Sequence, residues 1–314
     1  MGTKWNQTDL SVSLSSRRPP GSNLLRIIIL FSLLIPPTVC LISSCRHDSA
    51  DNPDLAENIN IAVDSIAFVI KLEVFDKLAE STHRVEQLDV FIYNADGMKE
   101  LDSWQRFESL PDSIVIKGTG APLTAVAIAN SPRSFNKAAI ERYDSIELVC
   151  CEFDEDSPQK PLMSGSCSIE KGREAKLILS PLMSRIVLAE ITNTMKGYVR
   201  LEDPRIWLEN MNADAEVLRT VGFRPSEYLQ GERKTPLPYD IGIFTQNPGT
   251  ELFCYPNDSA ATTIGTPATS LTLECEINGA TCRFPVDLPP IMRNQTIYVE
   301  ITVNGPDSSE SNTF

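Results

Sequence analysis

The sequence predicts an all-β protein with two strand-rich halves, and three observations indicate this. Beyond Ile59, apolar residues alternate with polar ones in short runs separated by turn residues, the period-2 pattern of half-buried strands. Only one stretch, residues 134–143, has convincing helical spacing. The roughly 270 residues that follow an N-terminal leader exceed what one small core usually organises. We therefore expect two tandem β domains at residues 59–181 and 182–303.

The leader ends in a distinctive four-residue sequence. Three arginines precede an apolar run at residues 27–35, and a pair of prolines then ends the run. A positive lead, a short apolar segment and small residues are typical of an export signal, whereas a membrane-spanning helix needs about 20 apolar residues. Ile-Ser-Ser-Cys at residues 42–45 resembles the bacterial lipobox. The resemblance implies that residues 1–44 are a lipoprotein signal peptide and that Cys45 is the lipid attachment site.

The chain is strongly acidic, and this charge argues against binding to nucleic acid. It carries 42 acidic against 28 basic residues, a formal net charge of −14, and the leader holds more positive than negative charge. The part beyond the leader is therefore more acidic still. Such a surface repels phosphate backbones, so we expect no nucleic acid partner.

Residues 45–58 are polar and acidic and lack any apolar period, which predicts a flexible tether. Asp48, Asp51 and Asp54 fall just after the lipid cysteine. In lipoproteins of the Bacteroides group, acidic residues in this window resemble a surface-export signal. A plain solvated linker is the alternative.

In the first half, alternation predicts strands and one helix in order. Ser134 is a suitable N-cap for the helix, and the acidic residues 154–156 are expected in a solvated loop. Pro181 interrupts the longest apolar run, and proline is tolerated in a sheet only at an edge or a break, so we place the domain boundary near Leu182. The expected strands lie at residues 61–75, 85–93, 113–117, 123–129, 146–153, 167–169 and 176–192.

The second half repeats this pattern. Residues 212–231 are expected to be loop with one helical turn at 214–219, and residues 304–314 a polar, disordered tail. The expected strands lie at residues 205–210, 241–245, 251–255, 271–277, 280–285 and 298–303.

The turn Asn-Gly at residues 278–279 is the strongest short hairpin signal. A two-residue turn there places Cys275 directly opposite Cys282, with their Cα atoms about 5.5 Å apart. Glu274 and Glu276 would then point outward, away from the apolar face. The two cysteines could form a disulfide or remain buried thiols.

No residue pattern in the sequence indicates an active site. The chain has two histidines, His47 and His83, and no C-x-x-C pair, so a metal site is not expected. It lacks the sequence around a nucleophilic serine and any Gly-rich phosphate loop. Paired carboxylates could meet in the fold, but no spacing favours a pair. We expect a protein that is not an enzyme and has no cofactor.

Several stretches, taken in order along the chain, resemble the FimB-type fimbrial anchor and subunit lipoproteins of Bacteroidia, members of the type V pilus superfamily. They are the lipobox at Cys45 and residues 161–165, 182–188, 253–257 and 298–303. The resemblance implies two transthyretin-like β-sandwich domains. It also implies lipidation, export to the outer-membrane surface and donor-strand exchange, in which a strand of one subunit completes the sheet of a neighbour.

The function implied is that of a lipid-anchored fimbrial subunit, either the basal anchor or an accessory subunit. Its partners would be fimbrial stalk subunits, with the outer membrane reached through the covalent lipid. The alternative is a surface lipoprotein that binds glycan or host protein through loops of the sandwich, for which Trp207, Tyr228 and Tyr239 are candidate contacts.

Five Asp-Ser pairs followed by a small or aliphatic residue resemble the Bacteroides-type O-glycosylation motif. The motif is short and permissive, so chance also accounts for matches. The candidate acceptors are Ser49, Ser65, Ser113, Ser145 and Ser259.

Overall fold

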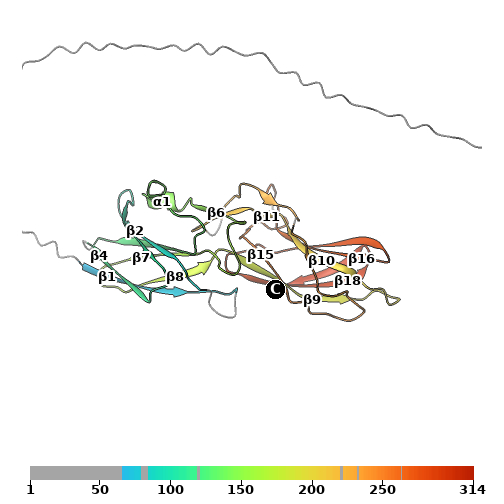
Figure 1. Cartoon of the computed structure of the whole chain (residues 1–314). Helices are drawn as coiled ribbons and strands as arrows, with labels where there is room; N and C mark the ends of the chain where they lie inside the picture. The colour runs from blue at the N-terminus through green and yellow to red at the C-terminus, as the bar shows by residue number, and fades with distance from the viewer. Residues whose placement is uncertain (1–65, 79–83, 119–120, 220–221, 232, 263) are drawn as a thin grey trace, which may run out of the picture. The chain divides into compact units, whose positions relative to one another are not determined.

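The computed structural model describes residues 66–78, 84–118, 121–219, 222–231, 233–262 and 264–314 (Figure 1). The chain is nearly all β, as predicted. Helix in the described residues is confined to a 3-10 turn, η1 (Lys137–Ala139), and to α1 (Tyr143–Ile146). None of the described helices is long and apolar enough to cross a membrane.

Seven strands form the first sandwich, in the order β3-β2-β5-β7-β8-β1-β4. Strands β7 and β8 share only two residue pairs, Met163 with Pro181 and Ser164 with Ser180. There the sheet folds, so that β8-β1-β4 packs against β3-β2-β5-β7 (Figure 1). The strands are β1 (Ile66–Val74), β2 (Leu88–Asn94), β3 (Leu101–Phe107), β4 (Ser113–Gly118), β5 (Leu123–Ala129), β7 (Met163–Ile169) and β8 (Ala175–Pro181).

Strand β2 is buried on both faces, which explains its nearly continuous apolar sequence. Leu88, Val90 and Ile92 face the core between the two layers of the first sandwich. Phe91 and Tyr93 face the opposite side, where the segment carrying η1 and α1 covers them. The hydroxyl of Tyr93 donates a 2.9 Å hydrogen bond to the carbonyl oxygen of Ile140, which fixes that cover.

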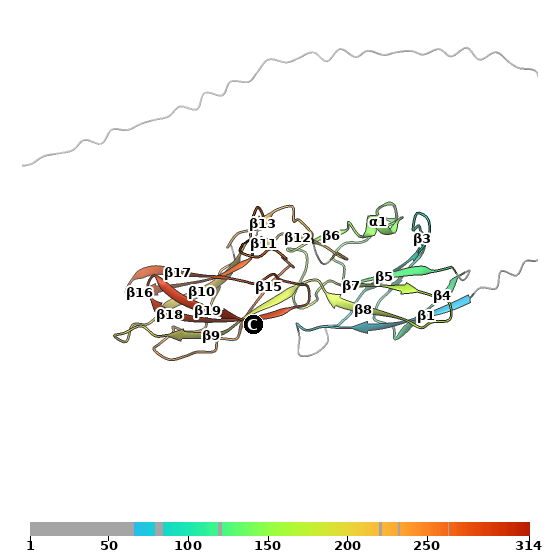
Figure 2. The ribbon, with the colours of Figure 1, turned by 180° about the vertical axis from the view of Figure 1, so that it is seen from behind.

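Two four-stranded sheets form the second sandwich, in the orders β14-β10-β16-β17 and β15-β9-β18-β19 (Figure 2). Strand β18 runs parallel to β9 and is flanked on its other side by the antiparallel β19. The strands are β9 (Ser184–Asn193), β10 (Glu202–Glu209), β14 (Thr235–Pro236), β15 (Thr250–Cys254), β16 (Ser270–Ile277), β17 (Ala280–Asp287), β18 (Thr296–Gly305) and β19 (Ser308–Thr313).

Two short sheets complete the fold. In one, β6 (Cys150–Glu152) pairs with β12 (Asp214–Glu216), which joins segments from the two halves of the chain. In the other, β11 (Met211–Asn212) pairs with β13 (Tyr228–Leu229). A single apolar core extends from Leu78 to Val303 and includes residues of both halves. The division into two domains near Leu182 remains a prediction.

The helix expected at residues 134–143 is wrong apart from the 3-10 turn. The backbone there is used for pairing with the β2–β3 connection instead. Leu101 N donates to the carbonyl oxygen of Glu141 at 2.8 Å, and Tyr143 N to that of Lys99 at 3.0 Å. Helical hydrogen bonds would compete with these contacts for the same backbone groups.

Three further expectations are wrong. Residues 214–216 form strand β12 rather than a helical turn. Residues 241–245 make only an isolated bridge, between Ile241 and Leu201. The tail is ordered, because residues 308–313 form β19 against β18.

The hairpin register is confirmed, with Cys275 opposite Cys282 and Ile277 opposite Ala280. Glu276 is exposed as predicted, but Glu274 is only 9% exposed. Its carboxylate accepts hydrogen bonds from Lys234 and from Arg283, both at 2.8 Å. The hydrogen bond from Lys234 is the main reason that the pKa of Glu274 lies below its usual value, and Arg283 lowers it further.

Candidate functional site

The open edge formed by β18 and β19 is the candidate functional site. Alternate residues of β18, namely Ile297, Val299, Ile301 and Val303, are at most 1% exposed. No residue of β19 is buried, and its sequence Ser-Ser-Glu-Ser-Asn-Thr has no apolar side chain. Strand β19 therefore covers the backbone edge of β18 but contributes nothing to the core.

Few side-chain contacts hold β19 in place. The rings of Tyr298 and Phe314 stack with their centroids 5.7 Å apart. The backbones of these two residues exchange hydrogen bonds of 2.9 and 3.1 Å. An incoming strand with alternating apolar residues could form the same backbone ladder and bury more side-chain surface, which is the chemistry of β-strand addition.

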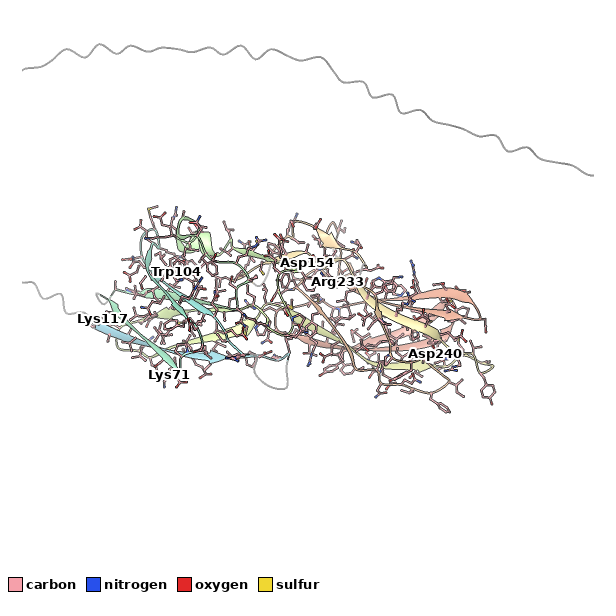
Figure 3. The ribbon with its side chains drawn as sticks, in the orientation of Figure 1. Lys71, Trp104, Lys117, Asp154, Arg233 and Asp240 are labelled. Atoms are coloured by element: carbon pink, nitrogen blue, oxygen red, sulfur yellow. The ribbon has the colours of Figure 1, made fainter. Side chains whose placement is uncertain are left out.

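The first sandwich has a second long edge at β4, beside β1. Its outward face carries the half-exposed apolar pair Val69 and Val115, which lie opposite each other. The neighbouring outward positions are charged: Lys71 pairs with Glu174, and Lys117 lies exposed near the end of β4 (Figure 3). Charged side chains at an edge discourage unintended strand pairing, so we regard the β18–β19 edge as the better candidate.

The predicted lipid attachment site Cys45 and the candidate acceptors Ser49 and Ser65 lie outside the described residues. Of the other acceptors, Ser113 is exposed at the start of β4, and Ser145 is half-buried within α1. Ser259 is only 8% exposed, so a glycan there would require its loop to open.

Cys275 and Cys282 are both buried, free thiols in the structure. The Cys282 thiol contacts the carbonyl oxygen of Ala280 at 3.6 Å. Burial raises the pKa of Cys275 to about 12, which makes its thiol a poor nucleophile. A disulfide between the two stays a prediction.

The acidic loop at residues 154–156 is more ordered than a solvated loop. Asp154 pairs with Arg233, which also lies over the ring of Phe153 (Figure 3). The carboxylate of Asp156 accepts backbone hydrogen bonds from Ser157 and Leu162, both at 2.8 Å, and one from the Tyr255 hydroxyl at 3.2 Å.

Burial raises the pKa of Asp156 above its usual value. The side chain lines a cavity of about 210 Å³ together with Phe153, Met183 and Phe253. Since both oxygens of Asp156 already have partners, the residue serves to order this loop.

Within the described residues, no group of three or more His, Cys, Asp or Glu side chains is placed to hold a metal ion. His83 lies outside them. Among the candidate aromatic contacts, Trp207 is 2% exposed and donates to the Glu209 carboxylate at 3.0 Å, so it is unavailable to a ligand. Tyr228 is half-buried and Tyr239 is exposed.

Solved structures with a similar fold are cell adhesion and fimbrial proteins of Bacteroides and Porphyromonas. A cell adhesion protein from Bacteroides eggerthii, described as putative, is 15% identical, with a TM-score of 0.58 over 80% of this chain and 95% of its own. A fimbrilin from Porphyromonas gingivalis is 13% identical, with a TM-score of 0.56 over 79% and 95%. The C-terminally truncated tip fimbrial protein of the same species is 13% identical, with a TM-score of 0.53 over 80% and 98%.

The chain has the fold of these proteins. No protein-family model matches the sequence, and no curated protein sequence matches it either. The likeness covers most of the length of each solved structure, so it includes both sandwiches. At sequence identities of 13–15%, this similarity establishes the fold alone.

Proposed function

We propose that this protein is a lipid-anchored subunit of a bacterial surface fimbria, acting as its basal anchor or as an accessory subunit. The observation that carries the proposal is the β18–β19 edge, where a buried strand is covered by one that places no side chain in the core. The shared fold with a fimbrilin and a tip fimbrial protein supports it. The lipobox at Cys45 supports attachment to the outer membrane at the cell surface.

Assembly would proceed by β-strand addition. A strand from a stalk subunit replaces or extends β19 and gains main-chain hydrogen bonds to the sheet. Among the described strands none pairs with the outer edge of β19, and this edge supplies the donors and acceptors for such pairing. No step in this function requires catalysis or a cofactor, since subunits join through their backbones.

Removal of residues 306–314 is expected to leave a folded protein that self-associates. The core should survive because β19 buries no side chain, whereas the bare edge of β18 should recruit other strands. Size-exclusion chromatography would detect the oligomers, and an added peptide of residues 306–314 should return the protein to monomer. The same peptide with a proline in place of Asn312 is the control, because Asn312 lies in a hydrogen-bonded pair with Glu300 and proline cannot donate to the ladder. A truncated protein that stays monomeric would contradict the proposal.

Substitution of Cys45 by alanine is expected to abolish incorporation of a radiolabelled fatty acid and to release the protein from the membrane fraction. The thiol is the only group to which the lipid would attach in this reading. Cys40→Ala is the matched control, because that cysteine lies within the predicted signal peptide. Unchanged labelling in Cys45→Ala would rule out the anchor.

A further inference from the structure

Two loops of the second sandwich meet in an open groove of about 510 Å³ that the proposed function does not use. One loop connects β9 to β10 and carries Tyr198. The other, at residues 239–246, carries Phe244. These two rings are among the most exposed aromatic side chains of the described residues, at 83% and 73%. Neither stacks on another aromatic ring of the described chain.

Both loops are held firmly at their bases. Ile191 and Gln246 exchange backbone hydrogen bonds of 2.8 and 2.9 Å, and Leu201 and Ile241 exchange two of 2.9 Å. Asp240 accepts from the backbone of Asp203 at 3.1 Å, which ties the second loop to β10 near its start (Figure 3). The exposed rings therefore sit on a pre-organised frame, which lowers the entropic cost of binding a ligand.

The first loop is held in the same way. The Asn193 side chain donates to the carbonyl oxygen of Val199 at 2.8 Å and accepts from Met195 N at 3.0 Å. Thr194 N donates to the carbonyl oxygen of Val303 at 3.0 Å. These contacts close the loop around its tip, where Tyr198 lies.

Tyr198 has a φ of +59°, in the left-handed region. A bulky side chain is disfavoured there, and turns with this conformation normally use glycine or asparagine. Gly197, with a φ of +88°, precedes it. The fold thus bears a strained tyrosine at a solvent-exposed tip, where the ring makes no contribution to a core. Such an outlier points to a role in contact with something outside the chain.

The chemistry of the lining identifies the class of ligand. The groove is lined by threonine, asparagine, methionine, glycine, isoleucine and the two aromatic residues, with no charged side chain among them. The Thr192 hydroxyl donates to the Glu190 carboxylate at 3.0 Å and accepts from the Thr245 hydroxyl at 2.9 Å, so both hydroxyl oxygens keep spare acceptor capacity. Exposed rings offer flat apolar faces, and the threonine oxygens can accept hydrogen bonds from the hydroxyls of a neutral ligand.

We infer that this groove binds a neutral oligosaccharide, whose C–H faces pack on Tyr198 and Phe244 and whose hydroxyls bond to the threonines. A volume of about 510 Å³ lies within the range of small-molecule sites. Anionic ligands are disfavoured because no cation is among the residues that line the groove and the chain is acidic. Binding requires no assembly, so it is a property of the monomer.

The test is an array of neutral oligosaccharides with their sialylated and sulfated counterparts, probed with the monomeric protein. Binding is expected to be confined to neutral glycans, and raising the salt concentration should leave it unchanged. Affinity for a bound neutral glycan should fall at least tenfold in Phe244→Ala and in Tyr198→Gly. The matched control Phe75→Ala removes a half-exposed ring of the first sandwich and should bind as the parent does.

Tyr198→Gly separates a binding role from a structural one. Because glycine relieves the strain at φ +59°, the melting temperature should not fall while binding is lost. Failure of every neutral glycan to bind, binding of acidic glycans alone, or unchanged affinity in both loop variants would overturn the inference. Capture of a protein at the groove in place of glycan would also overturn it.

Discussion

Gly165→Ala is expected to unfold the protein or to destabilise it by about 3 kcal/mol or more, at the upper end of the cost of overpacking. A Cβ atom at this position would lie 2.0 Å from the backbone carbonyl oxygen of Ile178. That oxygen belongs to β8, which cannot retreat because β1 pairs with it on the other side. The close approach of β7 and β8 occurs beside the two residue pairs that fold the sheet into layers.

Urea denaturation followed by far-UV circular dichroism would measure the loss. Gly242→Ala is the matched control, because a Cβ atom there meets nothing within 4 Å and its φ is not in the left-handed region. The control should change stability by no more than about 0.5 kcal/mol. Equal urea midpoints for Gly165→Ala and Gly242→Ala would show that β7 and β8 leave room for a Cβ atom at residue 165.

Arg293→Met is expected to lower the free energy of unfolding by about 3–5 kcal/mol, the cost of leaving several buried polar groups unpartnered. The guanidinium donates to the carbonyl oxygens of Ser180 at 2.6 Å, Pro181 at 3.3 Å and Val217 at 3.3 Å, and to the Ser164 hydroxyl at 3.0 Å. It thereby joins β7, β8 and the segment after β12. Burial lowers the pKa of Arg293 to about 10, so the group remains charged at neutral pH.

Chemical denaturation at pH 7 would measure the effect. Arg200→Met is the control, since Arg200 is largely exposed and pairs with Asp240 at 3.6 Å. Surface pairs of this kind contribute about 0–1 kcal/mol. Arg293→Lys should fall between the parent and Arg293→Met, because lysine keeps the charge but not the planar fork of donors. A stability of Arg293→Met within error of the parent would refute the role of this side chain.

Strands with alternating apolar residues could be predicted from the sequence, because the alternation itself shows which side chains face the core. The hairpin register also followed from the sequence, since a two-residue turn at residues 278–279 leaves one pairing. Strand β3 was not predicted. Its sequence Leu-Asp-Ser-Trp-Gln-Arg-Phe lies at a sheet edge and alternates poorly. There, Trp104 and Arg106 instead satisfy the buried carboxylate of Asp89.

The candidate site could not be predicted for a related reason. Strand β19 is held by backbone hydrogen bonds, which leave no trace in side-chain type, so residues 308–313 read as a polar tail. The groove is equally hidden, because Tyr198 and Phe244 lie far apart in the sequence and meet only through the pairing of their loops. Sequence reasoning selected Trp207 instead, the large aromatic residue that the fold buries.

The parallel pairing of β9 with β18 constrains the order in which the chain can fold. Strand β9 cannot acquire this neighbour until the ribosome has made residues 296–305. Among the described residues, the core of the first sandwich comes from residues 68–179 alone, and the late residue Asn294 adds two hydrogen bonds to this sandwich: it accepts from Lys77 N at 2.8 Å and donates to the carbonyl oxygen of Phe75 at 2.7 Å. The edge of β9 that pairs with β18 must therefore stay unpaired until β18 has been made, and unpaired strand edges make incomplete chains prone to aggregation.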